Sequence, residues 1–158
     1  MSLFEMNRRA VIPTSVAFFA ASLTPVSADE HPAIHIVKDP NCGCCTEWAR
    51  VLDAEGFSVS MAHRSGEDLE RLKQSAGIPQ ALWSCHTAAV DGYLIEGHVP
   101  PADIRRLLAE RPAAIGLAVP GMPYGAPGMG PEDERDAYTV YLMHQDGSAQ
   151  VFAEYPAA

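Results

Sequence analysis

Alternation of apolar and polar residues predicts two short strands separated by a helix where the regular pattern of the chain begins. Residues 33–39 form a β-rich run that ends before Pro40, and residues 57–63 alternate between apolar and polar side chains. Between these runs, apolar residues recur at helical spacing, and Gly56 is well placed to end the helix. The pattern therefore predicts the order strand, helix, strand.

A second helix, a hairpin and a third helix follow in the pattern. Ser65 and Asp68 have the spacing of a capping box at a helix N-terminus, and Gly77 is expected to end that helix. Residues 86–98 resemble two strands joined by an Asp-Gly turn. Residues 100–111 place their apolar side chains on one helical face, which predicts the third helix.

The order of these elements predicts an α/β fold of the thioredoxin-like class, with a mixed sheet and flanking helices. In this plan a strand leads into a cysteine loop at a helix N-terminus, and a hairpin and a last helix complete the domain. Nine of the sixteen residues 116–131 are Gly or Pro, which predicts a Gly/Pro/Met-rich loop without helix or strand. Residues 138–155 predict a C-terminal β-hairpin around a second Asp-Gly turn.

The first 28 residues have the features of a secretory signal peptide. Arg8 and Arg9 precede an apolar stretch, and small residues up to Ala28 suit signal peptidase. The apolar stretch is shorter than the roughly 20 residues of a membrane span, and an uncleaved anchor is the alternative. We therefore expect a single domain, residues 29–158, in the periplasm, with no membrane insertion after cleavage.

Composition narrows the class of function. The chain is 47% hydrophobic, which is enough for a core without disulfide staples. Its net charge of −9 argues against nucleic acid or an anionic membrane as a partner. The sequence also lacks the pattern of a Ser-His-Asp triad, a pair of catalytic carboxylates or a phosphate-binding glycine loop. We therefore expect a binding protein rather than an enzyme.

Four cysteines carry the candidate chemistry. Cys42, Cys44 and Cys45 lie in "NCGCCTEW", ahead of a helix whose N-terminus favours thiolates. Cys42 and Cys45 have the C-x-x-C spacing of a redox pair, so a thiol-disulfide oxidoreductase is one alternative. Two structural disulfides in an exported chain are another. A third thiol beside the pair adds nothing obvious to a dithiol catalyst, but it adds a ligand to a metal site.

A later segment, "WSCHT", extends the predicted metal site. In a thioredoxin-like fold the segment that enters the third strand lies against the cysteine loop and normally carries a cis-proline. Cys85 and His86 occupy that place here and are expected to face the earlier cysteines, with His98 near them. Thiolates and thioethers select Cu(I), and Met122 and Met129 in the Gly/Pro loop offer thioethers. Zinc held by three cysteines and one histidine is the alternative.

The chain resembles domain-of-unknown-function family 411 in four segments. These are "CGCCTEWARVLDAEGF", "SCHTAAVDGYLIEGHVP", "RLLAERP" and "GLAVPGMPYGAPGM". The family consists of small exported proteins with a thioredoxin-like domain, which are described as predicted metal-binding and are often associated with copper resistance. The resemblance implies copper ligands among Cys42, Cys44, Cys45, Cys85, His86, His98, Met122 and Met129.

The residues and the resemblance together predict a periplasmic protein that holds copper, as Cu(I), for sequestration, delivery or resistance. The expected partners are the copper ion itself and other periplasmic copper proteins. This prediction depends on one spatial arrangement, because folding must bring Cys85 within bonding distance of the three earlier cysteines.

Overall fold

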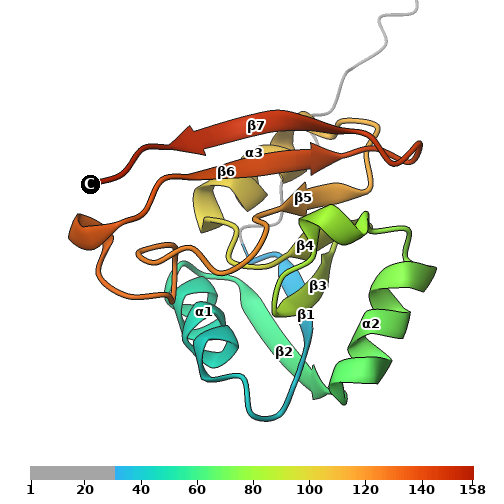
Figure 1. Cartoon of the computed structure of the whole chain (residues 1–158), viewed down its shortest axis with the longest axis horizontal. Helices are drawn as coiled ribbons and strands as arrows, with labels where there is room; N and C mark the ends of the chain where they lie inside the picture. The colour runs from blue at the N-terminus through green and yellow to red at the C-terminus, as the bar shows by residue number, and fades with distance from the viewer. Residues whose placement is uncertain (1–30) are drawn as a thin grey trace, which may run out of the picture.

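A computed structural model describes residues 31–158, which form one seven-stranded mixed sheet with helices on both sides (Figure 1). The predicted signal peptide lies outside the described residues. Along the chain the elements are β1 (Ala33–Lys38), α1 (Gly43–Ala54), β2 (Ser58–His63), α2 (Gly66–Ser75), the 3₁₀ turn η1 (Gln80–Leu82), β3 (His86–Val90), β4 (Tyr93–Glu96), α3 (Pro101–Glu110), β5 (Gly116–Ala118), the 3₁₀ turn η2 (Glu132–Glu134), β6 (Tyr138–Met143) and β7 (Ala149–Tyr155). No helix in residues 31–158 is long and apolar enough to cross a membrane.

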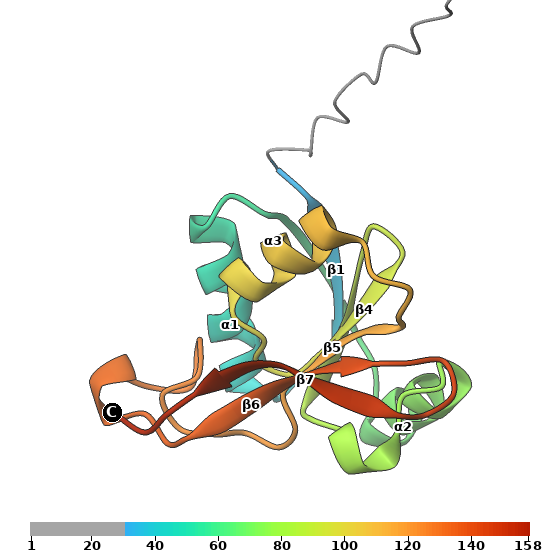
Figure 2. The same ribbon diagram turned by 90° about the horizontal axis from the view of Figure 1, so that it is seen from above.

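The predicted thioredoxin-like plan is confirmed by the strand order β2-β1-β3-β4-β5-β6-β7. Strand β1 runs parallel to β2 and antiparallel to β3, and β3 and β4 form the predicted hairpin. Figure 2 shows α1 and α3 on one side of this part of the sheet and α2 on the other. The loop after β1 and the segment before β3 therefore lie at the same end of the sheet, because Lys38 pairs with His86.

Local sequence signals account for the ends of several elements. The hydroxyl of Ser65 accepts a hydrogen bond from the Asp68 N–H at 3.3 Å, as the predicted capping box requires. Asp91 and Gly92 both adopt positive φ angles at the β3–β4 turn, which is the geometry of a type I′ hairpin. The C-terminal hairpin is confirmed as β6 and β7, which pair antiparallel with a register shift after Val140.

The main core lies between the sheet and helices α1 and α3. Trp48 and Leu52 of α1 are fully buried, as are Ile104 and Leu107 of α3. The indole N–H of Trp48 donates a hydrogen bond to the Val99 carbonyl at 2.9 Å. A buried Trp with its N–H satisfied adds packing and a fixed orientation, and this Trp directly follows the cysteine-bearing turn of α1.

One prediction about the Gly/Pro-rich stretch was wrong, because its first residues form strand β5. Gly116–Ala118 pair in parallel with β4 and antiparallel with β6. A Cβ at residue 116 would lie 1.7 Å from the Leu94 carbonyl oxygen, so only glycine permits this approach. Strand β5 therefore joins the C-terminal hairpin to the thioredoxin-like strands, and the loop proper occupies residues 119–131.

Candidate metal centre

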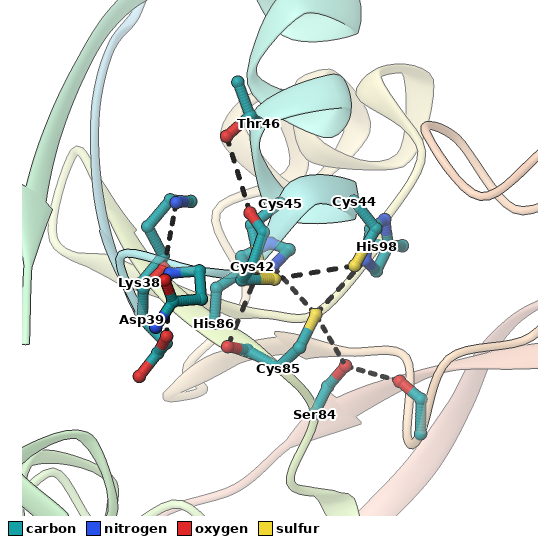
Figure 3. The surroundings of a disulfide bond; sticks show 12 residues. Lys38, Asp39, Cys42, Cys44, Cys45, Thr46, Ser84, Cys85, His86 and His98 are labelled. Carbon is teal, nitrogen blue, oxygen red and sulfur yellow. Dashed lines mark hydrogen bonds between the residues drawn. A yellow bond between two sulfur atoms is a disulfide. The ribbon is translucent and has the colours of Figure 1, made fainter. Parts of the chain in front are cut away.

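The cysteine loop lies between β1 and α1, and two of its cysteines are joined in a disulfide (Figure 3). Cys42 is the N-cap residue of α1, and its N–H donates to the Asp39 carbonyl at 3.1 Å. The disulfide joins Cys42 to Cys45, whose spacing places them on one face of the first helical turn. Cys45 is fully buried, whereas Cys42 is partly exposed. The C-x-x-C pair therefore exists as the spacing predicted.

Cys44 and Cys85 are the two free thiols, and the fold brings both to the disulfide. The Sγ atoms of Cys44 and Cys42 are 3.5 Å apart. Cys85 precedes β3, and all four cysteine Sγ atoms lie within 4.8 Å of one another. The spatial arrangement on which the sequence prediction depends is therefore present: the late cysteine meets the early three.

Two histidines complete a second group of ligand atoms around Cys85. The Cys85 Sγ lies 3.3 Å from Nδ1 of His86 and 3.2 Å from Nε2 of His98. The other ring nitrogen of His98 donates to the Pro127 carbonyl at 2.8 Å, which leaves the Nε2 lone pair directed at the sulfur. His86 is fully buried, and its Nε2 has no hydrogen-bond partner. These ligand atoms also lie within 4.8 Å of one another.

Burial controls the protonation of this group. Burial lowers the pKa of His86 well below its usual range, and the neighbouring His98 and Lys73 lower it further. Burial also lowers the pKa of His98, so both imidazoles are neutral at pH 7 and can act as ligands. Burial and the nearby Cys44 raise the pKa of the Cys85 thiol to about 12, so a metal ion must displace its proton.

Aromatic packing holds the two imidazole rings in place. The ring centroid of Trp48 lies 4.4 Å from that of His86, and the His86 and His98 rings meet edge to face at 5.0 Å. Because Trp48 is fully buried in the main core, the histidine pair packs against a fixed part of the domain. The ligand atoms of both rings are therefore preorganised.

The Gly/Pro loop reaches the site through its backbone. The Ser84 hydroxyl donates to the Gly121 carbonyl, and the same two residues form an isolated parallel bridge. Met122 follows with a side chain that is 58% exposed, whereas Met129 is partly buried. The sequence predicts both methionines as candidate ligands, and this stays a prediction.

Sequence reasoning missed a buried polar network beside the site. Glu96 and Lys73 form an ion pair with almost no exposed surface, and Thr87 is hydrogen-bonded to both. The N–H of Ser84 donates to Glu96 Oε1 at 2.6 Å. The one feature of the sequence that could have pointed to this network is that Glu96 lies two residues before His98.

Comparison with known proteins gives consistent matches. The model of a family described as "Protein of unknown function, DUF411" matches residues 82–129. Two solved structures titled "Copper resistance protein copG", Form 1 and Form 2, are 46% and 47% identical in sequence, with TM-scores of 0.75 and 0.73. They cover 81% and 80% of this chain, and the matches span 100% of each of their chains. Among curated proteins, none matches the chain.

Proposed function

The chain belongs to the DUF411 family, and from this premise we propose that it is a periplasmic protein that holds Cu(I) for sequestration, delivery or copper resistance. The observation that carries the proposal is the cluster of four cysteine Sγ atoms within 4.8 Å of one another, with two neutral imidazoles beside it. Sulfur-rich sites of this kind favour Cu(I). The titles of the two related structures name copper resistance, which supports copper over zinc.

The disulfide limits how many sulfurs can bind the ion. While Cys42 and Cys45 are joined, only Cys44 and Cys85 can supply thiolates. A dithiol reductant would supply two electrons and two protons, becoming a disulfide itself while Cys42 and Cys45 become thiols. Metal binding then releases protons as thiolates form. Reduction therefore doubles the number of sulfurs that can bind copper.

The direct test is an anaerobic Cu(I) titration of the reduced and the disulfide-bonded protein against a competing chelator. The reduced protein is expected to bind Cu(I) with a Kd far below micromolar. A micromolar Kd corresponds to a binding free energy of about −8 kcal/mol. The disulfide-bonded protein is expected to bind at least about tenfold more weakly, because two sulfur ligands are missing. X-ray absorption counts the sulfur neighbours directly. A Kd above micromolar for the reduced protein would contradict the proposed function.

A thiol-disulfide oxidoreductase is the second candidate, and the disulfide itself favours it. Cys42 is the partly exposed sulfur at the N-terminus of α1, where attack on a substrate disulfide is favoured. This function predicts that Cys42→Ser abolishes insulin reduction, whereas Cys44→Ser and Cys85→Ser retain it. Insulin turbidity with dithiothreitol measures the rate. A wild-type protein that gives no rate above the dithiothreitol background would eliminate this candidate.

A further inference from the structure

A buried ion pair connects helix α2 to the strand ends that carry the site. Glu96 at the end of β4 has no exposed surface, and Lys73 of α2 is 2% exposed. Lys73 donates to Glu96 and to the Thr87 hydroxyl, and the hydroxyl donates to Glu96 Oε2 at 2.7 Å. The three side chains come from α2, β3 and β4, so each hydrogen bond of this network joins two different elements.

Stability alone is a weak reason for such a pair to be buried. Removing two charges from water carries a large desolvation cost, and proteins with apolar residues of similar volume in place of such a pair are often as stable. Burial raises the pKa of Glu96, while Lys73, Thr87 and the Ser84 N–H act in the opposite direction. An apolar residue at 96 could replace the packing, but it could not accept the hydrogen bond from Ser84.

Ser84 needs this acceptor because it precedes β3 and lies outside the regular strand pairing. Its hydroxyl donates to the Gly121 carbonyl. Gly97 has a φ of +73°, and a Cβ there would lie 2.5 Å from the Ser84 Oγ, so the Ser84 side chain packs directly against the Gly97 backbone. Hydrogen bonds to Glu96 and Gly121 thus fix Ser84, Gly97 leaves room for its side chain, and the next residue is Cys85.

We propose that Glu96 is a positioning residue that places Cys85 against the other three sulfurs by accepting the Ser84 N–H. The same carboxylate ties the segment Ser84–His86 to the segment Glu96–His98, so it sets the spacing between the thiol and both imidazoles. The described residues contain no cis peptide bond, so no cis-proline fixes this segment. This inference rests on the proposed copper-binding function for its first measurement only.

Two double variants separate the effect of the hydrogen-bond acceptor at residue 96 from the effect of its charge. Lys73→Met with Glu96→Gln removes both charges but keeps a carbonyl oxygen for the Ser84 N–H. Lys73→Met with Glu96→Leu removes the charges and the acceptor. In the Cu(I) competition assay, the leucine variant is expected to bind about 10- to 100-fold more weakly than the glutamine variant, the range for losing a group that orients a ligand.

A measurement without metal separates this inference from the proposed function. In a Cys44→Ser background with the disulfide intact, Cys85 is the one free thiol. Its alkylation by iodoacetamide is expected to be several-fold faster in the leucine variant than in the glutamine variant, because the segment that carries it is released. If the wild-type protein failed to bind Cu(I), the proposed copper-binding function would be contradicted. The alkylation rates would still decide whether Glu96 positions Cys85.

Stability controls complete the experiment. Asp103→Asn alters another buried carboxylate, which accepts from the Tyr155 hydroxyl at 2.7 Å, outside the site. It is expected to lower the Tm while leaving Cu(I) affinity and alkylation unchanged. If the leucine variant does not fold, Glu96→Asp keeps the charge and withdraws the carboxylate by one methylene. Equal affinities and equal alkylation rates across the compared pair would overturn the proposal.

Discussion

Replacing Cys85 with serine is expected to weaken Cu(I) binding by more than about 100-fold. Loss of a group that only orients a ligand already costs about 10- to 100-fold, and Cys85 is itself a proposed ligand. Its Sγ belongs to both groups of ligand atoms, the four sulfurs and the Cys85–His86–His98 group. Removing this one sulfur therefore weakens both groups at once. Anaerobic competition with a Cu(I) chelator measures the loss.

Cys85→Ser is also expected to change how Cu(I) affinity depends on pH. Because the pKa of Cys85 is raised to about 12, this thiol is protonated throughout the neutral range, and copper must displace the proton. Affinity is therefore expected to rise with pH between 6 and 8, and Cys85 contributes about tenfold per pH unit. Cys85→Ser should make the slope shallower by one proton.

A partly exposed histidine elsewhere, His144, supplies the control for this prediction. His144→Gln removes an imidazole that contacts Gln150 on the C-terminal hairpin. Its Cu(I) affinity and pH slope should equal those of the wild type. If Cys85→Ser binds Cu(I) as tightly as the wild type, or with the same pH slope, Cys85 is not a ligand.

The position of Cys85 could be predicted from the sequence because it follows from topology. The predicted thioredoxin-like plan places the segment before the third strand against the cysteine loop, and the observed antiparallel pairing of β3 with β1 produces this contact. The proximity of His98 follows in the same way, because a short turn at Asp91-Gly92 returns β4 beside β3. The order of elements, together with the thioredoxin-like plan that it predicts, was therefore enough to place these candidate ligand atoms in one region.

The buried network and strand β5 could not be predicted, because long-range packing creates both. The helical pattern places Lys73 among the polar residues of an amphipathic helix, and its partner Glu96 is 23 residues away in the sequence. The local sequence places Gly116 in a Gly/Pro-rich loop, and only its pairing with Leu94 of β4 and Met143 of β6 shows that a strand forms there. Local patterns record preferences of neighbouring residues, so they carry little information about such contacts.

Gly128→Ala is expected to lower both stability and Cu(I) affinity, because the loop lies directly on helix α1. Gly128 has a φ of +79°, and a Cβ there would be 2.5 Å from the backbone nitrogen of Trp48. The positive φ costs an alanine about 1 kcal/mol, and overpacking typically adds about 1–3 kcal/mol. The loop would have to move away from α1, and the adjacent Pro127 carbonyl would then no longer hold His98.

Gly121→Ala separates the clash from the backbone strain. Gly121 has a φ of +69° in the same loop, but a Cβ there would have no atom within 4 Å. The free energy of unfolding of Gly121→Ala should therefore fall by only about 1 kcal/mol, the cost of the positive φ. Its Cu(I) affinity should be retained, since the carbonyl of residue 121 still accepts from Ser84. Thermal denaturation and Cu(I) competition on both variants test this difference. If Gly128→Ala behaves like Gly121→Ala in both measurements, the contact between the loop and Trp48 does not hold His98. The orientation of that imidazole must then come from its contacts with Trp48, His86 and Cys85.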